Sequence, residues 1–265
     1  MENIRKVIRN TCFLLSMFLV LLFSGCSTIQ TEKDTLFQVS TINALLEGVY
    51  DGDVSFQELK QYGDFGLGTF NALDGEMIAV DGNFFQVKSD GIAYAVKDSM
   101  KTPFAAVTFF EPDKSFVLKN ISSFDQMEKQ IDNVFPTKNI FYAIRIDGVF
   151  DYIKARSVPK QKKPYPPLLE AVKHQTIFEY KNIKGTIAGL WCPSFVKGLN
   201  VTGYHCHFID EDRKAGGHLL DCKFKEAKVF IDYTSSFYMV LPESSDFFRK
   251  DLEKGKEGQI NKIEK

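Results

Sequence analysis

Histidine and cysteine are scarce in this 265-residue sequence, which contains four histidines and five cysteines. Two of the cysteines, Cys12 and Cys26, lie close to the N-terminus. The other three, Cys192, Cys206 and Cys222, are an odd number, which excludes a complete disulfide framework among them. Cys206 and Cys222 could pair with each other, but three buried thiols are the simpler interpretation, because free cysteine is among the most buried residue types.

A charge excess of either sign is also absent, since the formal net charge is −1 at pH 7. Without a basic face or stripe, the chain has no electrostatic footprint for nucleic acid, and we expect no nucleic-acid partner. The sequence shows no internal repeat. The only long apolar run, residues 11–23, is too short to span a membrane as an ordinary transmembrane helix.

That apolar run belongs to an N-terminal segment with the features of an export signal. It follows a basic cluster in the first ten residues and precedes Ser-Gly at 24–25 and then Cys26. The pattern resembles a bacterial lipoprotein signal in which Cys26 is lipidated and anchors the mature chain to the outer face of a membrane. Phe23 departs from the aliphatic residue usual there, so the alternative is cleavage near Gly25 and free secretion. In both cases the protein is exported, and residues 1–25 are excluded from the fold.

Aromatic residues, in contrast, are abundant: there are 25 phenylalanines and 10 tyrosines in a sequence that is 44% hydrophobic. This composition predicts a sheet-rich α/β (α+β) protein, because aromatic residues favour strands. Asp-Gly pairs between apolar stretches predict tight hairpin turns, and Ser55 with Glu58 forms a capping box for a short helix. The turns are expected at residues 74–75, 81–82 and 147–148, and the helices at 40–47, 55–63, 123–135, 168–175 and 245–252.

A basic, proline-rich segment at residues 157–167 interrupts this pattern and predicts a domain boundary, because proline fits poorly into a sheet or a helix interior. We therefore expect a tether at residues 26–34, an N-terminal α/β domain at 35–160 and a C-terminal β-rich domain at 161–265. Each domain is expected to contain a mixed or antiparallel sheet with short helices. The charged end, residues 253–265, would be classed as disordered on composition alone.

Three of the four histidines fall within residues 203–221. His205 and His207 lie two apart on a predicted strand, so their side chains share a face. Residues 210–217 predict a turn, after which His218 opens a second strand and could lie opposite the first pair. Three converging imidazoles with an open fourth position are a known arrangement of catalytic zinc, although unrelated histidines in a hairpin would give the same pattern. Zinc suits imidazole best, while iron, nickel and manganese stay open.

Three charged residues are further candidates for a site around such a metal. Glu76 directly follows the Asp-Gly turn at 74–75 and opens an apolar strand, so it is either a surface charge or a buried functional carboxylate. Arg156 closes a predicted strand, where arginine is ordinarily solvated. Glu264 lies one residue from the C-terminus, where a simple tail charge is the default interpretation.

Two segments resemble one known family. GLGTFNALDGEM at residues 66–77 resembles the first signature of the acetolactate decarboxylases, and GYHCHF at 203–208 with GGH at 216–218 resembles their metal-binding segment. The similarity extends over residues 35–265. It implies two α/β domains with a sheet in each, usually assembled as a homodimer.

The resemblance also implies roles for individual residues. It makes His205, His207 and His218 zinc ligands, places Glu76 and Arg156 beside the metal, and implies that Thr69 lines the same pocket. The family uses a glutamate near the C-terminus, for which Glu264 is the best-placed candidate and Glu257 a competitor.

The implied reaction is zinc-dependent decarboxylation of (S)-2-acetolactate to (R)-acetoin and carbon dioxide through a metal-chelated enediolate. The forked donors of Arg156 suit a carboxylate or an enediolate, and Glu76, or a water that it holds, is the favoured proton carrier. The alternatives are an exported zinc-binding lipoprotein without catalytic activity, or a zinc hydrolase in which Glu76 activates water. The expected partner is the small-molecule substrate, with membrane contact only through the lipid anchor.

Overall fold

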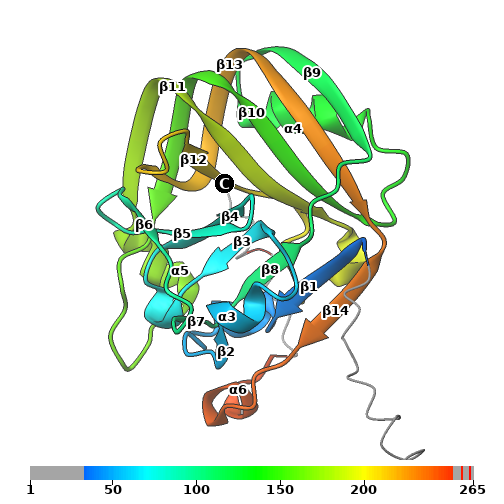
Figure 1. Cartoon of the computed structure of the whole chain (residues 1–265). Coiled ribbons are helices and arrows are strands. Elements are labelled where there is room, and N and C mark those ends of the chain that lie inside the picture. The colour runs from blue at the N-terminus through cyan, green and yellow to red at the C-terminus, as the bar shows by residue number, and fades with distance from the viewer. Residues whose placement is uncertain (1–32, 253–257, 259–262, 264–265) are drawn as a thin grey trace, which may run out of the picture. The chain divides into compact units, whose positions relative to one another are not determined.

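The computed structural model describes residues 33–252 together with Gly258 and Ile263. In this part of the chain the strands form two large sheets and one small one (Figure 1). The small sheet pairs β2 (Val54–Ser55) with β7 (Lys101–Thr102). The fold class predicted from the sequence, a sheet-rich α+β protein, is confirmed.

The first large sheet is mixed, because its edge strand β14 runs parallel to β1 while the other pairings are antiparallel. A tight Asp-Gly turn lies at its centre at residues 81–82, as predicted. The tight turn predicted at residues 74–75 is wrong, because β3 and β4 are joined by the six residues 70–75, which include a 3₁₀ turn at Asn71–Leu73. Asp81 and Gly82 both have positive φ and join β4 to β5 by a two-residue turn. The strands, in spatial order, are β14 (Ser236–Val240), β1 (Thr35–Val39), β8 (Ala105–Thr108), β3 (Phe65–Thr69), β4 (Glu76–Val80), β5 (Asn83–Val87) and β6 (Ala93–Ala95).

The second large sheet is antiparallel and closes on itself. β10 pairs with both β11 and β13, while β12 pairs with β11 on one side and with the beginning of β13 on the other. This closure curves the sheet tightly around the strand ends that carry the histidines. The strands are β9 (Lys114–Ile121), β10 (Phe141–Ser157), β11 (Thr176–Cys192), β12 (Gly203–Asp210) and β13 (Gly216–Thr234).

Short helices and 3₁₀ turns connect the strands. The predicted capping box is present, since Ser55 Oγ accepts from the Glu58 N–H and the Glu58 carboxylate accepts from the Ser55 N–H. The helix expected at residues 40–47 begins at Ile42, and its N-cap is Thr41, whose side chain accepts from the Ala44 N–H. The helices are α2 (Ile42–Leu46), α3 (Phe56–Leu59), α4 (Phe124–Asp132), α5 (Leu168–Ala171) and α6 (Ser245–Arg249), with 3₁₀ turns η2 (Asn71–Leu73), η3 (Val172–His174) and η4 (Ser194–Val196).

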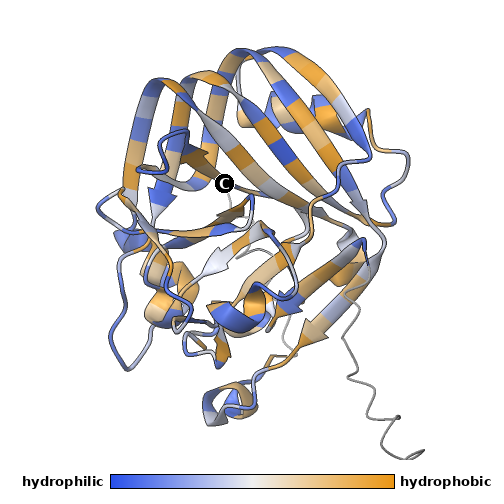
Figure 2. Ribbon diagram, in the orientation of Figure 1, coloured by the Kyte–Doolittle hydropathy of each residue, from blue (hydrophilic) through white to orange (hydrophobic). Residues whose placement is uncertain are grey.

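The sheets bury side chains on both of their faces. One apolar layer lies between the two sheets and includes Leu67 and Ile78 from the first and Leu190 and Ile209 from the second. A second layer packs the other face of the closed sheet against α4. A third packs the outer face of the first sheet against α3. In Figure 2 the long strands β10, β11 and β13 alternate between orange and blue bands, the period of two expected for strands.

The predicted hairpin at Asp147-Gly148 is wrong. β10 continues straight through both residues, which pair with Thr186 and Gly185 of β11 and with Lys228 and Ala227 of β13. A β-carbon on Gly148 would come within 2.9 Å of the Ala227 β-carbon, so the glycine serves close strand packing instead of a turn.

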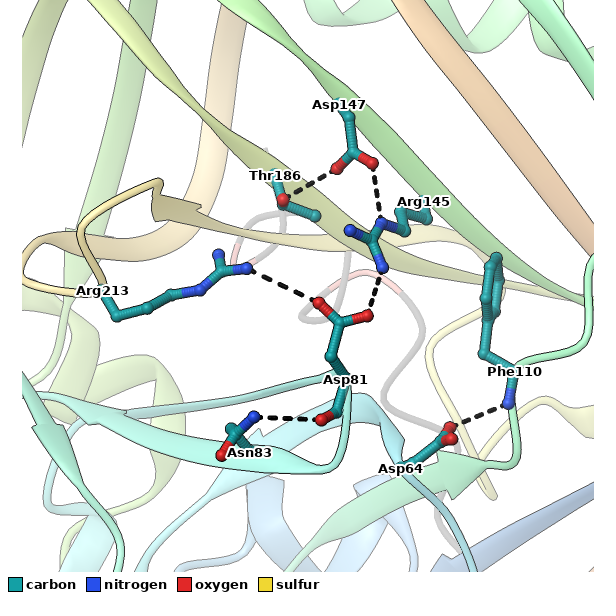
Figure 3. Close-up of polar contacts among 8 residues, drawn as sticks. All are labelled: Asp64, Asp81, Asn83, Phe110, Arg145, Asp147, Thr186 and Arg213. Atoms are coloured by element: carbon teal, nitrogen blue, oxygen red, sulfur yellow. Dashed lines mark hydrogen bonds and ion pairs between the residues drawn. The ribbon is translucent and has the colours of Figure 1, made fainter.

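Asp147 in turn forms part of a polar network between the sheets (Figure 3). Its carboxylate accepts from Thr186 Oγ1 at 2.8 Å and from Arg145 Nε at 2.8 Å. Arg145 also donates to Asp81 at the β4–β5 turn, and Arg213 approaches the same carboxylate. A polar residue in the middle of a strand therefore ties the closed sheet to the first sheet.

The described residues from Lys33 onward belong to one compact unit, and the second sheet takes strands from both sides of residue 160. The predicted division into domains 35–160 and 161–265 stays a prediction. Cys192, Cys206 and Cys222 are buried thiols that form no disulfide with another described residue, as expected. None of the helices in the described part of the chain is both long enough and apolar enough to cross a membrane.

Candidate metal centre

The histidines lie on the hairpin formed by β12 and β13. His205 and His207 are two apart on β12, and His207 is directly opposite His218 in the antiparallel register. Directly opposed residues point to the same face of a sheet, so all three side chains share one face. Asp210 shapes the connecting turn, because its carboxylate accepts from the backbone N–H groups of Lys214 and Ala215. The predicted strand–turn–strand and the convergence of the three histidines are confirmed.

Glycines allow the hairpin to approach its neighbours where His218 begins. A β-carbon on Gly216 would lie 2.2 Å from the Phe208 carbonyl oxygen. Gly217 has a φ of +145°, and a β-carbon there would lie 2.6 Å from the carbonyl oxygen of Arg156. The Gly-Gly pair is therefore a steric requirement of the strand packing, and it brings His218 opposite Arg156 on β10.

A β-bulge sets the direction of His218 relative to the rest of β13. The β10–β13 register shifts between Lys154, which pairs with Asp221, and Ala155, which pairs with Leu219. Leu219 faces the α4 core together with Cys222, although strict alternation would put these two on opposite faces. If residues 218–222 alternated regularly, His218 and Cys222 would share a face. The bulge changes this alternation, so that Cys222 faces the core while His218 faces the site.

The three imidazoles form a compact, buried cluster. Their ring centroids are 5.0, 5.1 and 5.2 Å apart, and one ring nitrogen from each lies within 4.8 Å of the others. Burial lowers the pKa of His205 to about 3, with a further contribution from the Arg156 charge. Burial, His205 and Arg156 likewise lower the pKa of His207 well below its usual value. His205 and His207 are therefore neutral, the form of imidazole that binds metal ions.

His207 fits the part of a metal ligand closely. Its Nδ1 lies 2.8 Å from the Met77 carbonyl oxygen, which can only accept, so Nδ1 carries the proton. Its Nε2 thus holds a lone pair, and this atom is buried with no hydrogen-bond partner among the described residues. Metal-binding histidines commonly donate their other N–H to a carbonyl in this way. Three clustered imidazoles fit zinc, and they also fit other imidazole-binding divalent metals.

The cluster opens on a small cavity of about 50 Å³ between the two sheets. Thr69, Glu76, Arg156, His205 and His218 all line this cavity, so the structure brings together these residues predicted from distant parts of the sequence. The rest of its wall is mainly apolar and includes side chains from α2, α5 and η3. The cavity therefore combines a polar, histidine-bearing end with a water-excluding wall.

Glu76 and Thr69 form adjacent positions on neighbouring strands, since they are register partners in the β3–β4 pair. Glu76 is 9% exposed, and its Oε2 lies 3.7 Å from His207 Nε2. It is therefore a buried carboxylate beside the histidines and not a surface charge. Thr69 donates its hydroxyl to the Gly75 carbonyl at 2.7 Å, which holds the turn leading into Glu76.

Arg156 is buried, with only 4% of its surface exposed. Its Nη1 donates to Gln175 Oε1 at 2.9 Å, and its Nε is buried with no hydrogen-bond partner among the described residues. The guanidinium therefore uses Nη1 for Gln175 and retains Nε as a donor that no described residue uses. Sequence reasoning missed Gln175 and the Met77 carbonyl, since neither carries a pattern that distinguishes it from an ordinary polar or backbone group.

Both tail candidates, Glu264 and Glu257, lie outside the described residues. Their neighbour Ile263 is described: it is 4% exposed, lies on the cavity wall and packs in the apolar cluster of α2 and α5. Asn43 on α2 also donates to the Leu252 carbonyl at 3.1 Å.

A largely apolar cavity lined by buried histidines, a carboxylate and a guanidinium has the features of an enzyme active site, and its three-histidine cluster could hold a metal ion. A simple metal carrier would require neither of the two charged groups. The chain belongs to the alpha-acetolactate decarboxylase family, whose model matches residues 36–254. It is accordingly a decarboxylase, an enzyme of the lyase class.

The relatives agree over most of the chain. Alpha-acetolactate decarboxylases from Methanosarcina mazei and Methylococcus capsulatus are each 50% identical to it over 233 residues, which is 88% of this chain and 81% and 90% of theirs. A crystal structure of alpha-acetolactate decarboxylase from Bacillus subtilis strain 168 is similar with a TM-score of 0.84 and 43% identity, covering 87% of this chain and 98% of that one.

Proposed function

We propose that this protein catalyses zinc-dependent decarboxylation of (S)-2-acetolactate to (R)-acetoin and carbon dioxide. Family membership supports the reaction. The observation that supports the metal dependence is the cluster of His205, His207 and His218. Two of these histidines, His205 and His218, line a cavity together with Glu76 and Arg156. The alternatives of a non-catalytic zinc carrier and a zinc hydrolase have no such support from the relatives.

The chemistry explains why these residue types are needed. The substrate carboxylate is β to a ketone, so losing carbon dioxide transfers an electron pair towards the ketone oxygen, and the barrier is the negative charge that develops there. A zinc ion held by the three histidines would supply Lewis-acid stabilisation of that charge. Apolar walls that exclude water make such stabilisation stronger than it would be in solution.

Arg156 binds the substrate carboxylate in this proposal. Its buried position and its unpaired Nε favour an anionic ligand, since a guanidinium can form two parallel hydrogen bonds to a carboxylate. It is not the proton donor, because an arginine side chain stays protonated at all ordinary pH values.

Glu76 handles the proton. After carbon dioxide leaves, the enediolate must be protonated on one face to give a single acetoin enantiomer. Glu76 is the first residue of β4, and its carboxyl group lies beside the histidines, so it can deliver a proton directly or through a water that it holds. Thr69 supports the turn that positions it.

The C-terminal tail contributes a second carboxylate, for which we keep Glu264 with Glu257 as the competitor. Support comes from Ile263, which is buried in the wall of the cavity although the local composition is that of a solvated tail. A carboxylate next to this anchor would complete the cavity on the side of α2 and α5.

The test compares His207→Ala with His174→Ala. His174 is the fourth histidine of the sequence and is exposed, so it provides a matched control. We expect His207→Ala to lose both the bound metal, measured by elemental analysis, and carbon dioxide release from racemic acetolactate, while His174→Ala keeps both. Full metal occupancy in purified His207→Ala would remove His207 from the ligand set.

Export, lipidation at Cys26 and homodimer assembly are further parts of the proposal. The first two rest on the N-terminal pattern at residues 1–26, which lies outside the described residues, and the third on the family resemblance. Mass spectrometry of the mature N-terminus distinguishes a lipidated Cys26 from simple cleavage near Gly25, and light scattering measures the dimer.

A further inference from the structure

The guanidinium of Arg156 is held by a side chain from the far end of a long connection. We infer that Gln175 is a positioning residue that sets which edge of the Arg156 guanidinium faces the cavity. This inference deepens the proposed function, because it rests on the proposed role of Arg156 in binding the substrate carboxylate.

Gln175 stands next to Arg156 because of strand pairing. Ser157 ends β10 and pairs with Thr176, the first residue of β11, so Gln175 immediately precedes this pair. Its backbone is fixed as well, since the Gln175 N–H donates to the Val172 carbonyl at 3.1 Å at the end of η3. Val172 itself lines the cavity. The amide is therefore attached to a rigid part of the cavity wall.

The hydrogen bond to Gln175 occupies one nitrogen, Nη1, of the Arg156 guanidinium. Arg156 Nη1 donates to Gln175 Oε1 at 2.9 Å, whereas Arg156 Nε has no hydrogen-bond partner among the described residues. A carboxylate binds two neighbouring N–H groups of a guanidinium in parallel. With Nη1 taken, the edge that contains Nε is the one left to a carboxylate in the cavity.

An amide suits this task better than a carboxylate would. Gln175 accepts the hydrogen bond without a charge, so Arg156 keeps its full positive charge for the substrate. A glutamate at the same place would accept the same hydrogen bond but would neutralise the guanidinium and compete with the substrate carboxylate. The inference therefore predicts that the charge at position 175 matters as well as the hydrogen bond.

The experiment measures kcat, KM, metal content and melting temperature for Gln175→Leu, with Lys173→Ala as the control. Lys173 lies two residues away on η3, pairs with Glu170 at the surface and does not contact Arg156. We expect kcat/KM to fall about tenfold to a hundredfold in Gln175→Leu, the cost of one hydrogen bond to a charged group. Metal content should stay unchanged, and Lys173→Ala should match the parent enzyme.

A second variant, Gln175→Glu, gives a readout that a merely structural role would not change. When its carboxyl group is protonated, it becomes a neutral acceptor again, so its activity relative to the parent should rise as the pH falls. If Gln175→Leu does not fold, this pH profile alone tests the positioning role of Gln175. A ratio that stays flat across pH would overturn the inference.

Arg156→Lys separates this inference from the proposed function. If Arg156→Lys keeps the parental kcat/KM, the proposed role of Arg156 is wrong. If Arg156→Lys is impaired while Gln175→Leu behaves like Lys173→Ala, the role of Arg156 stands and the positioning role of Gln175 is refuted. In the supported case, adding Gln175→Leu to Arg156→Lys costs less than it does alone, because the two residues act as a unit.

Discussion

At the scale of single residues, one backbone carbonyl orients a histidine of the three-histidine cluster. The Met77 carbonyl lies 2.8 Å from His207 Nδ1 and so fixes the tautomer, which leaves Nε2 facing Glu76. The residue that supplies this carbonyl directly follows Glu76 on β4. The beginning of β4 therefore orients His207 and also supplies the Glu76 carboxylate, which ties the position of the acid to that of the three-histidine cluster.

Replacing Glu76 with glutamine should separate chemistry from metal binding. We expect Glu76→Gln to keep its metal, because His205, His207 and His218 remain, but to lose activity by about 10²-fold or more, as for loss of a general acid or base. Carbon dioxide release and elemental analysis measure the two quantities. Glu226→Gln, at an exposed residue that pairs with Lys119 at 3.2 Å, is the control. Near-parental turnover by Glu76→Gln would rule out a role in proton transfer.

A glycine comparison tests the steric account of the hairpin. Gly217 and Gly203 both have positive φ, but only at Gly217 would a β-carbon meet another atom, the Arg156 carbonyl oxygen at 2.6 Å. Gly203→Ala should therefore cost about 1 kcal/mol of unfolding free energy from strain alone. Gly217→Ala should cost more and also reduce metal content, because His218 must shift. Equal effects of the two variants in urea titrations and metal analysis would contradict this account.

At the scale of elements, the sequence predicts local features better than strand length. The turn at Asp81-Gly82 and the capping box at Ser55 follow from local chemistry and are correct, whereas Asp74-Gly75 ends a six-residue connection instead of forming a tight turn. Asp147-Gly148 is the same dipeptide, yet it lies inside the 17-residue strand β10. Gly148 is held in the strand by its pairing with Gly185 and Ala227, and these partners are distant in the sequence.

The site shows the same division between local and distant information. The spacing of His205, His207 and the turn before His218 predicts their convergence, because all of it happens within one hairpin. The presence of Glu76 and Arg156 beside them came from the family resemblance, since it depends on two sheets packing together. Gln175 was missed altogether, because a single glutamine at a strand boundary has no distinguishing pattern.

Near the C-terminus, Ile263 departs from what the charged local composition suggests. Ile263 is buried in the cavity wall, so deleting residues 261–265 removes an apolar anchor together with Glu264. We expect this truncation to lose most of the activity while metal content and secondary structure, measured by circular dichroism, persist. Replacing Glu264 alone with glutamine separates the carboxylate from the anchor. Full activity in the truncated protein would mean that the tail carboxylate is not Glu264, and Glu257 would be tested next.

At the scale of the whole molecule, the active site exists because two sheets meet. The first sheet contributes Thr69 and Glu76 from β3 and β4, and the closed sheet contributes Arg156 and the histidines from β10, β12 and β13. The Arg145 network in Figure 3 joins the same two sheets at the other end of β4. The candidate active site and the polar network between the sheets therefore lie at opposite ends of one strand.

The packing between the sheets also carries a pH-sensitive group away from the site. Asp232 is fully buried, and the pKa of its carboxyl is raised to about 7. Burial is the main cause, the hydrogen bond from the Glu111 N–H opposes it, and the nearby acids Asp113, Asp34 and Glu111 add to it. A raised pKa means that the folded chain binds this proton more tightly than the unfolded chain does. The stability contributed by the protonated acid is thus present below about pH 4 and is lost as the pH rises to about 7.

Asp232→Asn should remove this dependence. The variant should equal the parent near pH 4 and exceed it by on the order of 2 kcal/mol at pH 8, a figure discounted for solvent screening. Urea unfolding at several pH values measures the difference. Asp53→Asn, at an exposed carboxylate, should follow the parent curve. A difference between Asp232→Asn and the parent that does not grow with pH would contradict the assignment.

The most direct test of the whole account is metal reconstitution of the intact enzyme. The protein is stripped with a chelator, the chelator is removed, and zinc is titrated back while carbon dioxide release from racemic acetolactate and bound zinc are measured together. The account predicts that the stripped protein is inactive and that activity rises in proportion to bound zinc until each chain holds a single ion at its three histidines. Decarboxylation at the full rate by the metal-free protein would contradict it.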